Sequence, residues 1–186
     1  MGLTVKQRGL HIATFRFIQV RLMETLAAWV PSTPEMGAKL LFGPHIWDLA
    51  QAADALGKRT YELRLPAQHS VAPSPSYLEL LERLAATSSA AERMAAFYDV
   101  MLPALAARYR CYLEQTDSLM DAPSVRVIED ILSVMGRMIR EADALRCEMP
   151  ALRLNEGELL RQLAAQESSV AELVGDDVAD SNPRAA

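Results

Sequence analysis

Glycine and cysteine are both scarce in this chain, which has 8 glycines and 2 cysteines among 186 residues. Alternating runs of β-branched residues are also rare, and alanine, leucine and methionine are abundant, so helix is favoured along the whole chain. Cys111 and Cys147 form no Cys-x-x-Cys pair, and the first ten residues hold no apolar core of signal-peptide length. We therefore expect reduced thiols, no disulfide framework and a cytoplasmic location.

Apolar runs of membrane-spanning length are missing because charged side chains interrupt every candidate, as Arg16, Arg21 and Glu24 do in the first one. The 19 basic and 24 acidic residues give a net charge of −5, and both signs are spread along the chain without a basic patch. The chain also contains no glycine-rich phosphate loop, no G-x-S-x-G and no H-E-x-x-H. We therefore predict no membrane or nucleic-acid partner and none of the chemistry that those motifs support.

Helical periodicity is abundant, and it predicts an all-α fold. The predicted helices cover residues 4–30, 33–63, 76–86, 89–119, 123–147 and 155–174. The loop at 65–74 is long enough to let the next long helix begin at the far end of the molecule. These features predict a four-helix bundle of two helical hairpins joined by a long crossover, with a short connecting helix and a C-terminal fifth helix. The bundle domain should span residues 1–174, and the small, acidic stretch 175–186 should be a disordered tail.

Prolines and capping residues predict the helix boundaries. Pro31 should end the first helix, and Thr33 should cap the second. Pro44 follows Gly43 inside the second helix, where the missing amide hydrogen predicts a kink or a break. Capping boxes predict three further helix starts, at Ser76/Glu79, Ser89/Glu92 and Asn155/Glu158.

Glu114 and Glu129 should face solvent, because each lies opposite a continuous apolar stripe when residues are placed about 100° apart on a helix. The first helix is apolar over most of its circumference, which is more than one hairpin partner can cover. Exposed apolar patches of this kind mark interfaces, so we predict a homo-oligomer.

Two hairpins joined by a crossover, with an Asp-Ala-Pro-Ser turn at 121–124 opening the last bundle helix, resemble the layout of the ferritin-like superfamily over about residues 4–147. The resemblance implies the bundle fold. Di-iron members of that superfamily carry inward glutamates on the first and third bundle helices and Glu-x-x-His on the second and fourth. Here those positions read Phe42-x-x-His45 and Glu129-x-x-Leu132, so one motif lacks its carboxylate and the other its histidine. The conventional di-iron site is therefore incomplete.

His45 is the strongest single candidate for a functional residue, because it follows the Gly43-Pro44 irregularity at the edge of the core and precedes Asp48 by one turn. Such a pair could bind a metal or transfer a proton. The interpretation that we favour is structural: His45 would hydrogen-bond a carbonyl that Pro44 leaves without its helical donor.

Three tyrosines form a second group of candidates. Tyr98 and Tyr112 lie on the inner stripe of their helix, and Tyr109 lies beside it, so the three could line a small-molecule pocket. The favoured alternative is a set of core residues whose hydroxyls reach the bundle surface. His11 is expected to be a packed residue near a helix end.

Three functions fit these features. The one that we favour is a ferritin-like bundle with no conventional di-iron site and no cofactor, which binds a small molecule or a protein partner in an accessory role. The second is a metal-dependent oxidoreductase or oxygenase of the ferritin-like kind, with iron or manganese held by an unusual set drawn from Glu24, His45, Asp48, Glu114 and Glu129. The third is a structural oligomerisation module in which the first or fifth helix packs against a second copy. The sequence leaves open which ligand is bound and whether the protein is an enzyme.

Overall fold

The computed structural model describes residues 2–154 and 157–174, and every regular element within them is helical. In chain order the helices are α1 (Val5–Ser32), α2 (Met36–Glu62), α3 (Pro75–Ala85), α4 (Ala90–Ala95), α5 (Leu102–Gln115), α6 (Ala122–Glu148) and α7 (Glu158–Ser169). A π-helical segment, Ala96–Met101, joins α4 to α5, and a 3-10 turn, Pro150–Leu152, follows α6. The predicted all-α class is confirmed. The predicted capping box at Asn155 and the predicted tail at 175–186 fall outside the described residues.

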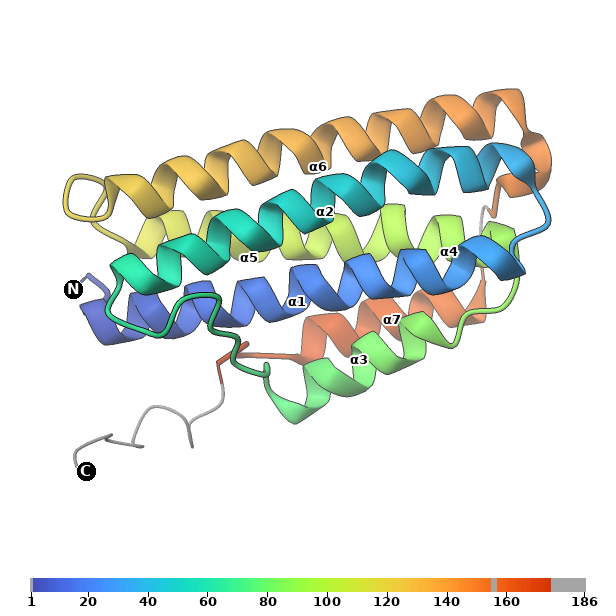
Figure 1. The fold of residues 1–186 in the computed structure, drawn as a ribbon. Helices are drawn as coiled ribbons and strands as arrows, with labels where there is room; N and C mark the ends of the chain where they lie inside the picture. The colour runs from blue at the N-terminus through green and yellow to red at the C-terminus, as the bar shows by residue number, and fades with distance from the viewer. Residues whose placement is uncertain (1, 155–156, 175–186) are drawn as a thin grey trace.

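Long helices run side by side along a common axis (Figure 1): α1, α2, α6 and the rod formed by α4, the π-helical segment and α5. α1 and α2 form an antiparallel hairpin, and α6 packs against both α2 and α5. α3 and α7 pack against each other on the other side of α1 (Figure 1). The loop 63–74 connects α2 to α3. Its Val71 amide donates a hydrogen bond to the carbonyl of Ala13 in α1 at 3.3 Å.

The core lies between the inward faces of these helices and is rich in aromatic rings. Phe15, Trp29, Phe42 and Phe97 are all buried, and the Trp29 ring centre lies 6.2 Å from those of Phe42 and Phe97. Each buried side chain of this size contributes roughly 1.5–3 kcal/mol to folding. None of the described helices combines the length and the apolarity needed to cross a membrane.

The predictions at Pro44, Pro31 and Thr33 differ from the structure. α2 runs as one continuous helix through the exposed Pro44, so the predicted break is wrong. α1 continues past Pro31 to Ser32, and Thr33 is the C-cap of α1 and does not cap α2. The Thr33 hydroxyl donates to the Trp29 carbonyl at 2.8 Å and accepts a hydrogen bond from Arg93 at 2.8 Å. The tertiary contact with Arg93 thus outweighs the local signal that placed Thr33 at the start of α2.

The capping boxes give a mixed result. The Ser89/Glu92 box is confirmed, with the Glu92 amide donating to the Ser89 hydroxyl at 3.2 Å. The Ser76/Glu79 box is wrong because α3 already begins at Pro75, with Ser74 before it. The third long helix also ends earlier than predicted, at Gln115.

The apolar circumference of α1 is largely covered within the same chain. Leu10 and Ala13 pack against Val71 of the loop 63–74, and α3 covers a further part of α1. The premise of the predicted self-association therefore no longer holds for α1. Exposed apolar side chains gather instead on one face of α2, as Met36, Leu40, Trp47 and Tyr61.

Candidate functional site

His45 lies fully buried between three helical elements and uses both ring nitrogens. Its Nδ1 is 2.7 Å from the Tyr98 hydroxyl, and its Nε2 is 2.8 Å from a carboxylate oxygen of Glu141. Tyr98 comes from the π-helical segment, where an extra residue per turn changes which side chains face the core. Glu141 comes from α6 and is 41% exposed, so the three side chains link the core to the surface.

The protonation states of Tyr98, His45 and Glu141 follow from burial and charge. Burial lowers the pKa of His45, and the hydrogen bond and charge of Glu141 only partly offset this, so the imidazole is neutral at pH 7. The hydrogen bond from His45 lowers the pKa of Glu141, which therefore remains a carboxylate. Burial raises the pKa of Tyr98 well above its usual value. Nε2–H therefore donates to Glu141, and Nδ1 accepts from the Tyr98 hydroxyl.

The predicted hydrogen bond from His45 to a carbonyl freed by Pro44 is thus wrong. Both partners of His45 are side chains from other helices, because the inner face of α2 turns the imidazole away from its own backbone. Arg137 completes the cluster by donating to Asp48 at 2.8 Å and to Glu141 at 3.3 Å. One guanidinium therefore lies between the two carboxylates and offsets part of their charge.

The five candidate metal ligands do not come together. Glu24 is exposed and pairs with Arg21 at 3.2 Å, and the carboxylate of Asp48 is bound by Arg137. Glu114 and Glu129 are exposed, as the periodicity predicted. Among the described residues no three His, Cys, Asp or Glu side chains are grouped so that they could hold a metal ion.

The tyrosine hydroxyls end inside the molecule and not at its surface. Tyr109 accepts a hydrogen bond from Gln19 Nε2 at 2.6 Å, and Tyr112 donates to Asp121 at 2.6 Å. The surface-reaching interpretation is therefore wrong for these two residues and for Tyr98. Tyr112 also lines the cavity described below.

Asp121 is a buried carboxylate that the sequence did not reveal. It is fully buried and receives hydrogen bonds from Arg59 at 2.9 Å and from the hydroxyls of Tyr112, Thr116 and Ser124 at 2.6–2.8 Å. Burial alone would raise the pKa of Asp121, but the hydrogen bonds outweigh it and hold that pKa below its usual value. The cluster ties α2, α5 and α6 together behind the Tyr112 ring.

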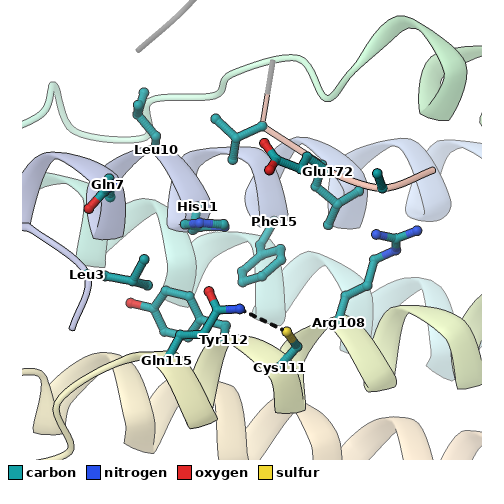
Figure 2. Close-up of a pocket in the computed structure, with 13 residues that line it drawn as sticks. Leu3, Gln7, Leu10, His11, Phe15, Arg108, Cys111, Tyr112, Gln115 and Glu172 are labelled. Carbon is teal, nitrogen blue, oxygen red and sulfur yellow. Dashed lines mark hydrogen bonds between the residues drawn. The ribbon is translucent and has the colours of Figure 1, made fainter. Parts of the chain in front are cut away.

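A cavity of about 440 Å³ lies between α1, α5 and the non-helical segment 170–174 (Figure 2). The α1 wall carries Gln7, His11 and Phe15, spaced by four residues so that they share one helix face. The remaining lining residues are Leu3, Leu10, Arg108, Cys111, Tyr112, Gln115, Ala171, Glu172, Leu173 and Val174. Apolar and aromatic groups therefore form most of the wall, and a few polar groups are placed among them.

The cavity wall formed by residues 170–174 is held by hydrogen bonds to its backbone carbonyls. The Leu173 carbonyl accepts from the Ser74 amide at 2.8 Å, and Arg108 donates to the Val170 carbonyl at 2.9 Å. The sequence placed 170–174 in the fifth helix, but α7 ends at Ser169 and residues 170–174 are not helical. The cavity could therefore not be found from helix periodicity.

Polar groups in the cavity differ in how well they are paired. Arg108 is bound by Glu167 at 2.6 Å, and the Gln115 amide donates to the Cys111 sulfur at 3.1 Å. The His11 ring packs against Tyr112 at 5.6 Å between centres, and burial lowers its pKa, so it is neutral at pH 7. Glu172 forms no hydrogen bond or ion pair with any residue that the structure describes, and in Figure 2 it lies on the wall opposite Tyr112.

Neither a family model, a curated protein nor a solved structure matches this chain. The ferritin-like resemblance therefore rests on the layout of helices alone, and the chemistry of the two sites has to be read from their own residues.

Proposed function

We propose that this protein binds a small organic molecule in the cavity of about 440 Å³ between α1, α5 and residues 170–174. In this proposal the long helices form a four-helix bundle of the ferritin-like layout, located in the cytoplasm, that works without a metal cofactor. The cavity carries the proposal, because its volume and its mixture of apolar walls with a few polar groups are typical of small-molecule sites.

Affinity should come mainly from apolar burial. A fragment that loses about 200 Å² of apolar surface against Phe15, Leu173 and the Tyr112 ring gains roughly 5 kcal/mol before the cost of immobilisation. Because immobilisation offsets much of this gain, binding of such a fragment should be weak, with a dissociation constant in the millimolar range. A larger natural ligand that also bonds to His11 and Gln115 would bind more tightly.

The test uses 4-phenylbutanol as a neutral probe of the cavity. We expect it to shift the backbone amide resonances of His11, Phe15 and Tyr112 in the ¹⁵N-labelled protein, and to slow the alkylation of Cys111. Cys147, the other exposed cysteine, serves as the internal control and should react at an unchanged rate. Failure of the probe to affect these signals up to its solubility limit would contradict the proposal.

A pair of cysteine variants sharpens the test. Cys111→Phe places a ring at the cavity wall and should abolish the shifts, whereas Cys147→Phe on α6 should leave them intact. If both variants bind the probe like the original protein, the probe is bound elsewhere.

The two other functions have weaker support. A metal-dependent reaction would need Glu24, Glu114 and Glu129 to leave their outward positions, and Arg137 already pairs with the carboxylates of Asp48 and Glu141 next to His45. Self-association remains a prediction, and the exposed apolar face of α2 is its best candidate surface. Light scattering of the original protein and of Trp47→Lys tests it, since loss of a dimer in the variant would support the assignment.

A further inference from the structure

We infer that the ligand of this cavity is an amphipathic organic cation, an amine whose apolar body packs on the aromatic wall while its ammonium group faces Glu172. The inference rests on the proposed function, because it concerns the same cavity. Its basis is the charge balance of the lining residues.

Arg108, the only arginine or lysine among the described lining residues, is already paired with a carboxylate. Its Nε donates to the Glu167 carboxylate at 2.6 Å, and its Nη2 donates to the carbonyls of Glu167 and Val170 at 3.1 and 2.9 Å. An anionic ligand would have to compete with a bound carboxylate for this guanidinium. Arg108 therefore offers little attraction for an anion.

The other titratable groups add no positive charge. Burial lowers the pKa of His11, so its imidazole is neutral at pH 7. Burial and the hydrogen bond to Asp121 raise the pKa of Tyr112, so its phenol is neutral as well. Glu172 is exposed at the edge of the cavity and has no ion pair among the described residues, so the described lining carries one carboxylate without a countercharge.

Aromatic rings strengthen the preference for a cation. Phe15, His11 and Tyr112 pack edge to face or tilted, with ring centres 5.6–6.1 Å apart, and all three line the cavity. Aromatic faces attract ammonium groups and give nothing comparable to carboxylates. A carboxylate opposite an aromatic wall is therefore an arrangement suited to an amine with an apolar body.

The experiment compares three probes that share one skeleton: 4-phenylbutylamine, 4-phenylbutanol and 4-phenylbutyrate. Amide shift titrations of the full chain at low ionic strength should give the affinity order amine, alcohol, carboxylate, with about a tenfold difference between the first and the last. Added sodium chloride should weaken binding of the amine and leave binding of the alcohol unchanged.

Glu172→Gln should remove most of the affinity difference between the amine and the carboxylate. Glu114 is an exposed glutamate of α5 outside the cavity, so Glu114→Gln should preserve that difference. Equal binding of the three probes, or an unchanged preference in Glu172→Gln, would overturn the inference and leave the proposed function standing. Binding of none of the probes would overturn both.

Discussion

The hydrogen bond between Tyr98 and His45 gives the sharpest stability prediction for this protein. Tyr98→Phe leaves Nδ1 of His45 buried without a donor, which should cost about 1–2 kcal/mol. His45→Leu leaves the Tyr98 hydroxyl buried without a partner, which should cost about 2–3 kcal/mol. Glu141 adds little to the second figure, because it is 41% exposed and water can replace its lost hydrogen bond.

The double variant removes both polar groups at once and leaves an apolar pair. Its loss of stability should therefore be smaller than the sum of the two single losses by about 1–2 kcal/mol. The free energies of unfolding come from urea titrations followed by circular dichroism, with Arg126→Ala as an exposed control. If the two losses add to within about 0.5 kcal/mol, the two side chains are not coupled and the hydrogen bond between Tyr98 and His45 is refuted.

Two further predictions concern pH and the buried aspartate. Burial lowers the pKa values of His11 and His45 in the folded state, so the unfolded chain binds protons first, and stability should decline as the pH falls below about 6.5. Urea midpoints measured against pH should show a shallower decline for His45→Leu, and an identical slope would speak against this linkage. Asp121→Asn should cost about 3 kcal/mol in thermal or urea unfolding, because Arg59 loses its buried carboxylate partner. The matched change Asp130→Asn removes only an exposed ion pair and should cost less than about 1 kcal/mol, and an equal effect of both changes would contradict the assignment.

Helical faces could be predicted well because a helix repeats every 3.6 residues and exposes its pattern locally. Tyr98 and Tyr112 were placed on the inner stripe and are buried, and Glu114 and Glu129 were placed outside and are exposed. Helix ends were predicted less well. A cap competes with tertiary contacts, as the bond from Arg93 to the Thr33 hydroxyl illustrates at the end of α1.

Candidate sites were harder to predict, because their residues are far apart in the chain. His45 could be singled out, but its partners lie 53 and 96 residues away, on segments whose register against α2 no local pattern specifies. Asp121 was recognised only as part of a turn, although it is the most densely hydrogen-bonded carboxylate described above. Long-range packing selects such partners after the helices have formed.

The sequence by itself determined the helical class and the inward faces, since amphipathic periodicity acts over a few neighbouring positions. Only the tertiary structure decided what those faces enclose. Segment 170–174 becomes a cavity wall because Ser74 and Arg108 donate hydrogen bonds to its Leu173 and Val170 carbonyls, and neither residue is near it in sequence. A cavity is space left between elements that pack at particular distances, and one chain's hydrophobic pattern specifies which faces meet but not how closely they fit.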